Sequence, residues 1–227
     1  PVRAAAERRE CFGRARRRTI RIGNRHVEIL ADGNRLFLPR HGLKGQVPPH
    51  KLDHAAHMRA LKALGADAVL AICSVGSLQR RITPAHYVVP DDYMGLWTPA
   101  TAFDRGAHHI TPSLDETLRR VLIRAARKLR LPLVNRGVYV QTVGPRLETR
   151  AEIRFLSRFA DVVGMTMASE ATVARELDLP YAALCVVDNF ANGLVKQPLT
   201  LKQIMDSAAR KWPVLIRLLE LAARELA

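Results

Sequence analysis

Side chains capable of binding and proton chemistry stand at the ends of apolar runs in this sequence. Four such runs end in Arg40-His41, Cys73-Ser74, Met165-Thr166 and Asp188-Asn189. A fifth leads into the stretch GPRLETRAEI, from Gly144 to Ile153. Arginine can clamp an oxyanion with two parallel hydrogen bonds, a carboxylate accepts from N–H donors, and an amide can donate or accept. Taken singly, each of these residues is more often a surface, turn or helix-cap residue than a ligand-binding one.

The intervening segments predict alternating strands and helices. We expect a hairpin in HVEILADGNRLFLP, with its turn at residues 31–34, because Asp-Gly supplies the positive φ that a hairpin needs. Helices are expected over 49–64, after a capping box of Ser113 with Glu116, over about 150–159, over 169–177, and from about Thr200 with a kink or restart at Pro213. Buried strands are expected in DAVLAIC, HYVVP, VYVQTV, DVVGM and YAALCVV, and residues 91–109 are expected to form a long irregular loop.

This alternation predicts an α/β fold, a single domain with a central mixed β-sheet flanked by helices. Ligands in such folds collect at the carboxyl ends of the strands, where the residues above are found. A chain of 227 residues is long enough for one such domain and somewhat short for two. Its 48% hydrophobic content is typical of a globular protein, and no apolar run approaches the ~18 residues of a membrane span. We therefore expect no membrane association.

The cysteines and the charge bear on location and partners. Cys11, Cys73 and Cys185 are odd in number, widely spaced and without a metal-ligand pattern, which favours a reducing cytoplasm and no metal site. The net charge of +15 is concentrated toward the N-terminus, where residues 1–25 contain many arginines and only Glu7 and Glu10 as acids. We interpret this segment as a basic arm. It could contact nucleic acid, but no aromatic residue is interleaved for base stacking, so a solvated segment is the favoured reading.

Six motifs in the same order, FLPRHG, VPPH, SVGSL, GPRLETRAEI, ADVVGMTMASEATVARELDLPYA and VVDNFANG, resemble the trimeric purine nucleoside phosphorylase and methylthioadenosine phosphorylase family. The resemblance runs from about Leu36 to the C-terminal helix, and is strongest toward the bacterial S-methyl-5'-thioinosine phosphorylases. It implies a nucleoside phosphorylase domain over residues 26–227. It also implies inorganic phosphate as co-substrate and no metal or organic cofactor.

Within that family, the resemblance implies a phosphate site made by Arg40, His41, Ser74 and Thr166. Met165 corresponds to the residue that lies against the ribose, where an apolar side chain and a backbone donor suit a sugar. A lone methionine at a strand end is otherwise more often a core residue.

The resemblance implies that Leu147 packs on the purine face and that Glu148 points at the purine edge. A carboxylate accepts hydrogen bonds, so it suits the N1–H of hypoxanthine or guanine rather than the unprotonated N1 of adenine. Asn189 corresponds to the residue that donates to O6 or N7 of a 6-oxopurine, and Ala191 follows it in the same motif. We therefore expect Asn189 and Glu148 to be the catalytic residues. The alternatives are a helix cap for Glu148 and a turn residue for Asn189.

Leu201 and Met205, four residues apart, match apolar positions that line a methylthio pocket, although both could be ordinary core residues. His109 resembles a residue lent to a neighbouring subunit, which implies a homotrimer with shared sites. The expected reaction is phosphate-dependent cleavage of S-methyl-5'-thioinosine to hypoxanthine and 5-methylthioribose 1-phosphate. The alternatives are a general inosine and guanosine phosphorylase, or a weakened homologue that binds purines or nucleic acid.

The sequence departs from the family pattern in four places. It has no Gly-Gly-Thr/Ser-Gly phosphate loop, Gly45 stands where relatives usually have His, and Ser169-Glu170 replaces Pro-Glu. Residues 53–57 read Asp-His-Ala-Ala-His in place of Asn-Tyr-Arg-Ala-Asn. These differences concentrate around the expected phosphate site.

Overall fold

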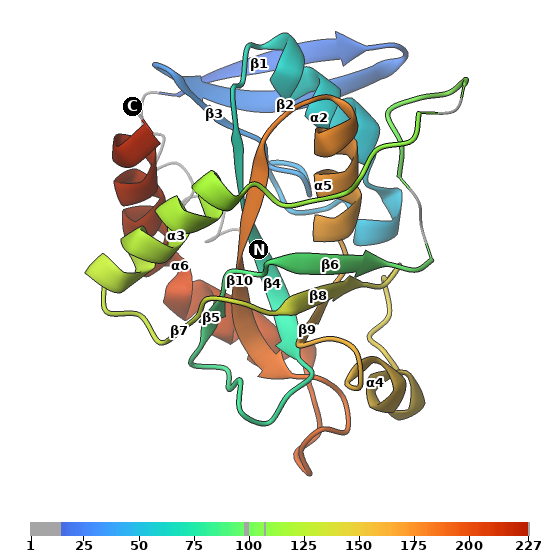
Figure 1. The fold of residues 1–227 in the computed structure, drawn as a ribbon, viewed down its shortest axis with the longest axis vertical. Helices are drawn as coiled ribbons and strands as arrows, with labels where there is room; N and C mark the ends of the chain where they lie inside the picture. The colour runs from blue at the N-terminus through green and yellow to red at the C-terminus, as the bar shows by residue number, and fades with distance from the viewer. Residues whose placement is uncertain (1–14, 98–99, 107, 227) are drawn as a thin grey trace.

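A seven-stranded mixed sheet forms the centre of the protein, as the computed structural model shows (Figure 1). The structure describes residues 15–97, 100–106 and 108–226. The strand order is β6-β8-β9-β4-β10-β5-β7, in which β4 is antiparallel to β9 and β10 is antiparallel to β5, while the remaining neighbours are parallel. The strands are β4 Val69–Ser77, β5 Tyr87–Val88, β6 Asp92–Gly95, β7 Leu133–Val134, β8 Val138–Gln141, β9 Val162–Gly164 and β10 Tyr181–Phe190. The predicted fold class is confirmed.

The two long strands β4 and β10 lie side by side at the centre of the sheet. They pair in parallel from Val69 with Tyr181 to Ser77 with Phe190, and a bulge at Asp188 shifts the register. The sequence predicted Ser74 at the end of a strand. This prediction was wrong, because the pairing extends β4 to Ser77 and Ser74 lies within the strand. The bulge gives Asp188 an extra place in β10 and re-aims the residues that follow it.

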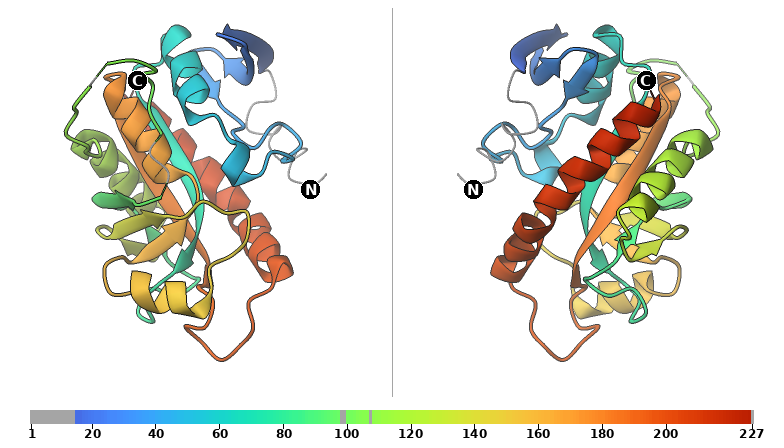
Figure 2. Two further views of the ribbon diagram at one scale, coloured as in Figure 1. Left: turned by 90° about the vertical axis from the view of Figure 1, so that its right-hand side faces the viewer. Right: turned by 90° about the vertical axis from the view of Figure 1, so that its left-hand side faces the viewer.

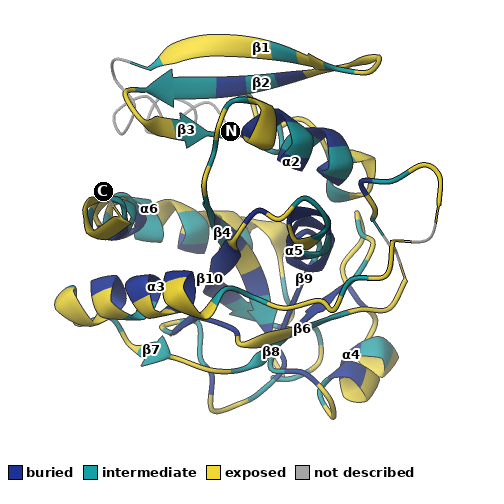
Figure 3. Cartoon of the chain, turned by 45° about the horizontal axis from the view of Figure 1, so that its top comes forward, coloured by how far each residue is buried: buried dark blue, intermediate teal, exposed yellow. Residues whose placement is uncertain are grey.

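Helices cover both faces of the sheet. Alternate side chains of β4 and β10 pack against α2 His54–Ala63 and α5 Met167–Glu176 on one face, and against α3 Glu116–Lys128 and α6 Leu201–Leu226 on the other (Figure 2). Helix α5 is buried on nearly all sides because it lies between the sheet and α2 (Figure 3). The short helix α4 Arg150–Leu156 packs against β8 and β9.

A small antiparallel sheet of β1 Arg16–Ile22, β2 Arg25–Asp32 and β3 Arg35–Phe37 packs over α2 (Figure 3). The hairpin predicted around Asp32-Gly33 is confirmed. Part of the segment that we interpreted as a basic arm, residues 1–25, forms β1, because Ile20 and Ile22 pack on the core and the whole strand pairs with β2. Residues 1–14 lie outside the described residues, and the division of the chain at residue 25 stays a prediction.

Several local predictions were wrong. The expected helix over 49–64 divides into a 3-10 turn, Pro49–Lys51, and α2, because Asp53 caps α2 by accepting from the Ala56 N–H. The N-cap of α3 is Asp115, which accepts from the Leu118 N–H, and not Ser113. The segment 91–109 contains β6, which pairs with β8, and the short strand β7 was not expected. Helix α6 runs through Pro213 without restarting.

Candidate functional site

Glu148 is held in the turn between β8 and α4 by two hydrogen bonds. Its Oε1 accepts a hydrogen bond from the Thr142 hydroxyl at 2.6 Å, and its carbonyl oxygen accepts from Asn192 Nδ2 at 3.0 Å. The next residue, Thr149, is the N-cap of α4 in a capping box with Glu152. The helix-cap reading of Glu148 is therefore wrong, because Thr149 and Glu152 fill that role. Glu148 is only 8% exposed, so its position is set by the fold.

A hollow of about 230 Å³ opens beside this carboxylate. The residues that line it are Trp97, Thr142, Val143, Gly144, Arg146, Glu148, Glu152 and Leu156. Arg146 binds both oxygens of Glu152, at 2.7 and 2.8 Å, and this pairing lowers the pKa of Glu152 to about 2. With Glu152 neutralised by its partner, Glu148 is left as the carboxylate available to a ligand in this hollow.

The strand end that carries Asn189 lies against the turn that carries Glu148. Asn192 Nδ2 bonds the Glu148 carbonyl, and a Cβ on Gly193 would meet Arg150 Cγ at 2.7 Å, so residues 192–193 touch the 148–150 segment directly. Asn189 itself donates from Nδ2 to the Phe190 carbonyl at 2.8 Å, over Gly76. Ala191 is buried. The fold thus brings the two segments together, but Asn189 does not line the hollow that Glu148 lines.

Met165 lies against the other end of the same turn. A Cβ on Gly144 would meet Met165 Sδ at 2.6 Å, and Gly144 has a φ of +69°, so only glycine suits this position. Thr166 follows at the N-cap of α5, buried, with its N–H donated to the Tyr139 hydroxyl at 3.1 Å. The Met167 N–H donates to the same hydroxyl at 3.2 Å. The Tyr139 hydroxyl therefore accepts from two backbone N–H groups at the start of α5, those of Thr166 and Met167.

Arg40 points into the protein. Its Nε lies 2.6 Å from Glu170 Oε1 in an ion pair without hydrogen-bond geometry, and its Nη1 donates to the Ile72 carbonyl at 3.0 Å. Burial, the largest single effect, would lower the pKa of Arg40, but Glu170 together with Cys73, Tyr181 and Tyr139 more than offsets it, and the pKa is raised. Glu170 also accepts from the Tyr181 hydroxyl at 2.8 Å. In this arrangement Arg40 does not present the two-pronged clamp that the sequence predicted. His41 lies beside it, and its Nδ1 is 2.9 Å from the Val47 carbonyl oxygen.

Two histidines of α2 lie next to this ion pair. Burial lowers the pKa of His54, and it lowers the pKa of His57 to about 4, although the nearby Glu170 opposes both shifts. The two rings meet edge-on with centroids 6.5 Å apart. Both imidazoles are therefore neutral at pH 7.

The Ser74 hydroxyl donates to Asp188 Oδ2 at 2.6 Å, so its single proton is not available to phosphate in this arrangement. Asp188 Oδ1 accepts from the Ser207 hydroxyl of α6 at 2.9 Å, and Lys211 Nζ lies 3.5 Å away. Lys211 further donates to the Val187 and Pro84 carbonyls. Desolvation lowers the pKa of Lys211, and Asp188 partly offsets this. The network ties α6 to the strand bulge that precedes Asn189.

The remaining predicted residues are exposed. Leu147 is 41% exposed, Met205 is 45% exposed and Leu201 is 68% exposed, so the reading of the last two as core residues is wrong for a single chain. His109 is exposed in the segment before α3. Each of these side chains is available to a ligand or to a second chain.

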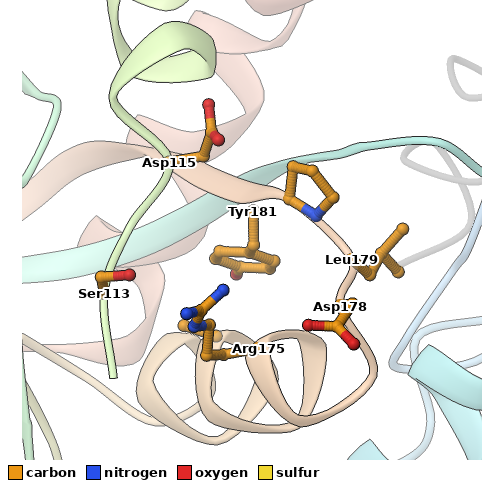
Figure 4. Close-up of a pocket in the computed structure, with 8 residues that line it drawn as sticks. Ser113, Asp115, Arg175, Asp178, Leu179 and Tyr181 are labelled. Carbon is orange, nitrogen blue, oxygen red and sulfur yellow. The ribbon is translucent and has the colours of Figure 1, made fainter. Parts of the chain in front are cut away.

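A second hollow, of about 140 Å³, lies at the opposite end of β10 (Figure 4). The Tyr181 ring forms its floor, and Arg175, Asp178 and Ser113 surround it. None of the predicted site residues lines this hollow. We assign the candidate site to the carboxyl end of the sheet, where Glu148 is.

The sequence analysis assigned no role to Thr142, Asn192, Glu170 or Asp188. Thr142 lies next to last in the run VYVQTV, and Asp188 was named with Asn189 as a strand end, so the motifs contained both residues. Glu170 had been noted only as part of a departure from the family pattern. Its partner Arg40 is 130 positions away, and no local signal links them.

A mixed sheet is covered by helices, with the acid of Glu148 in a turn and the amide of Asn189 near the end of β10. In α/β proteins, small polar ligands bind at such carboxyl ends of strands. The chain belongs to the phosphorylase superfamily, whose family model matches residues 3–223. This match includes most of residues 1–25, which we interpreted as a basic arm preceding the nucleoside phosphorylase domain. The protein is an enzyme of the purine nucleoside phosphorylase type, a pentosyltransferase.

Relatives of known name bear this out. The chain is 41% identical over 191 residues to a probable 6-oxopurine nucleoside phosphorylase from Archaeoglobus fulgidus, with 84% of this chain and 79% of that protein covered. It is 35% identical to a probable S-methyl-5'-thioinosine phosphorylase from Thermodesulfovibrio yellowstonii, with 80% and 71% covered. A solved methylthioadenosine phosphorylase from Schistosoma mansoni, bound to adenine, shares the fold with a TM-score of 0.86 at 24% identity, over 93% of this chain and 84% of that one.

Proposed function

We propose that this enzyme cleaves S-methyl-5'-thioinosine with phosphate, giving hypoxanthine and 5-methylthioribose 1-phosphate, as a step of purine salvage. The observation that carries the proposal is the buried carboxylate of Glu148, held by Thr142 at the edge of a hollow. A carboxylate fixed there accepts a hydrogen bond from N1–H of a 6-oxopurine, whereas adenine offers no proton at N1.

In the proposed reaction, the bond between C1' and N9 breaks with its electron pair on the purine, and phosphate attacks C1'. Asn189 donates to the O6 or N7 side of the departing base, and Glu148 accepts from N1–H. Interactions that strengthen as charge develops lower the barrier, and one such donor contributes a few kcal/mol. Asn189 now donates to the Phe190 carbonyl, so base binding requires its amide to turn. Ala191 and Leu147 complete the base site, and Met165 packs on the ribose.

Phosphate binding falls in this proposal to Arg40, His41, Ser74 and Thr166. Arg40 supplies positive charge, because its guanidinium stays ionised beside Glu170. Direct donation from Arg40 or from the Ser74 hydroxyl requires each to leave its present partner, Glu170 or Asp188. The proposed reaction uses no metal or organic cofactor, and the cytoplasm is its proposed location. Among the described residues, no helix is long and apolar enough to cross a membrane.

The apolar residues at the start of α6 support the methylthio substrate. Leu201 and Met205 are exposed and stand one helical turn apart, which suits an apolar 5' group better than a hydroxyl. The name of the Thermodesulfovibrio relative agrees with this choice. The second candidate is general phosphorolysis of inosine and guanosine, which the name of the Archaeoglobus relative favours.

We further propose a homotrimer with shared sites, in which His109 serves a neighbouring subunit. Large apolar side chains are exposed on the hollow, the turn and α4: Trp97, Val143, Leu147, Phe155 and Phe159. Patches of this kind mark protein interfaces. The mass of the protein in solution tests this part of the proposal.

Base release from methylthioinosine, inosine and methylthioadenosine, measured side by side with and without phosphate, tests the proposed reaction. We expect phosphate-dependent release of hypoxanthine, with methylthioinosine the best substrate. Equal or better use of methylthioadenosine would contradict the assignment of Glu148 and Asn189. A weakened homologue would instead show no release with any of the three nucleosides.

A further inference from the structure

The orientation of the Glu148 carboxylate is imposed by the sheet through Thr142. The Thr142 N–H donates to the Gly164 carbonyl at 2.9 Å, which continues the pairing of β8 with β9 and fixes the Thr142 backbone. Its hydroxyl donates to Glu148 Oε1 at 2.6 Å, whereas the Gly164 carbonyl oxygen is 3.5 Å from the same hydroxyl. A hydroxyl has one proton, so the shorter contact takes it.

This hydrogen bond changes what the carboxylate can offer a ligand. A free carboxylate accepts two parallel N–H bonds, one at each oxygen. Here Oε1 already accepts from Thr142 on the protein side, and Glu148 is 8% exposed while lining the hollow. Within the described residues no hydrogen bond to Oε2 is found, so Oε2 is the oxygen of this carboxylate with its full capacity to accept left for a ligand.

We propose that Thr142 is a positioning residue that makes Glu148 selective for a purine edge with one N–H donor over an edge with two. This inference rests on the proposed function, since it assigns the base edge to Glu148. Hypoxanthine presents N1–H beside a C–H at C2, whereas guanine presents N1–H beside an amino group at C2. The second donor of guanine gains less from Oε1, because that oxygen already accepts the Thr142 hydrogen bond and has only one lone pair left.

The substitution Thr142→Val tests this inference because it keeps the shape of the side chain and frees Oε1. We expect the ratio of kcat/KM for guanosine over inosine to rise roughly tenfold, the effect of one hydrogen bond to a charged group. The kcat/KM for inosine should fall, since Glu148 loses its fixed orientation. Thr142→Ser keeps the hydroxyl and should keep the wild-type ratio.

The matched control is Thr101→Val. The Thr101 hydroxyl donates to Glu176 Oε1 at 2.9 Å, so this variant removes the same kind of hydrogen bond at residues that do not line the hollow. It should leave the guanosine to inosine ratio unchanged. A merely structural role of Thr142 would lower activity on both nucleosides equally, which the ratio also distinguishes.

Binding of the free bases gives a readout that does not depend on turnover. Trp97 lines the hollow, so hypoxanthine and guanine can be titrated by tryptophan fluorescence in the wild type and in Thr142→Val. We expect guanine to gain on hypoxanthine by the same factor in the variant. If inosine is cleaved but both ratios are unchanged, the inference is wrong and the proposed function stands. If wild-type protein neither cleaves 6-oxopurine nucleosides nor binds their bases, the proposed function and this inference are both overturned.

Discussion

Arg40 and Glu170 form an ion pair in the interior, with Nε and Oε1 2.6 Å apart and only 1% of the Glu170 side chain exposed. The Tyr181 hydroxyl adds a hydrogen bond to the same carboxylate. The pair joins the loop after β3 to α5, two segments that meet only in the folded protein. Its geometry leads to the first prediction.

Removing the charge of Glu170 should destabilise the protein strongly. In Glu170→Gln the buried Arg40 loses its counter-charge, and breaking a buried pair from one side costs about 3–5 kcal/mol. For a chain of this size we expect the Tm to fall by roughly 10 °C in a thermal melt. The control is Asp206→Asn, which removes the exposed pair with Lys202 and should cost less than about 1 kcal/mol. Equal melting of the two variants would contradict the account.

Acidification should destabilise the fold between about pH 6.5 and pH 4. The pKa of His57 is lowered to about 4 in the folded protein, so the unfolded chain binds more protons over that range. The free energy of unfolding therefore decreases as the pH is lowered. His54 shifts in the same direction, and the charges near the pair are Arg40, Glu170 and Asp53, with His41 also near His54.

Melting curves from pH 7.5 to pH 5 measure this effect. His57→Asn should flatten the pH dependence, whereas His26→Asn, at an exposed position of β2, should not. A wild-type Tm that is constant over this range would show that the two imidazoles do not titrate as the structure indicates.

Much of the fold could be predicted because many strands and turns are determined by residues that are close together in the sequence. The apolar runs of β4, β8, β9 and β10 and the Asp-Gly turn each depend on neighbouring residues. The α3 cap could not be chosen this way. Asp115 wins over Ser113 because its N–H is held by the Tyr181 carbonyl at 2.9 Å, a contact between distant segments. The two-residue strand β7 likewise exists only through its pairing with β5.

The sequence predicted which residues belong to the candidate site better than it predicted their hydrogen-bond and ion-pair partners. Glu148 and Asn189 were recognised from their motifs, and Asn192, which follows β10, holds the Glu148 turn beside the end of that strand. The inward direction of Arg40 and the commitment of the Ser74 hydroxyl to Asp188 depend on residues more than 100 positions away. Sequence spacing carries no information on such pairs, so the predicted phosphate site looked simpler than the structure makes it.

The substitution Asn189→Asp should shift base preference toward 6-aminopurines. A protonated carboxyl can donate to N7 while its other oxygen accepts from the N6 amino group, a pattern that an oriented amide favouring O6 does not provide. We expect the ratio of adenine to hypoxanthine release to rise about tenfold, as for a gained or lost polar contact in a binding site. The ratio is measured on methylthioadenosine and methylthioinosine. A flat ratio would mean that Asn189 does not face the base.

Polar substitution at the start of α6 should act on the 5' group alone. In the double variant of Leu201→Ser and Met205→Ser, kcat/KM for methylthioinosine should fall about tenfold, since each apolar contact contributes about 1–3 kcal/mol to discrimination. The kcat/KM for inosine should stay within about twofold. Leu226→Ser, exposed at the far end of the same helix, is the control. An equal loss on both nucleosides would place these residues in general stability or in a subunit interface instead.

The central claim is that the carboxylate of Glu148 recognises the N1–H of a 6-oxopurine, and hypoxanthine release by Glu148→Gln with saturating phosphate tests it most directly. Glutamine keeps the size and one acceptor oxygen but removes the charge, and a hydrogen bond to a charged group is worth about 1.5–3 kcal/mol. We predict that kcat/KM for methylthioinosine falls by roughly 10- to 100-fold, while the Tm changes little. Wild-type rates of hypoxanthine release in this variant would contradict the claim.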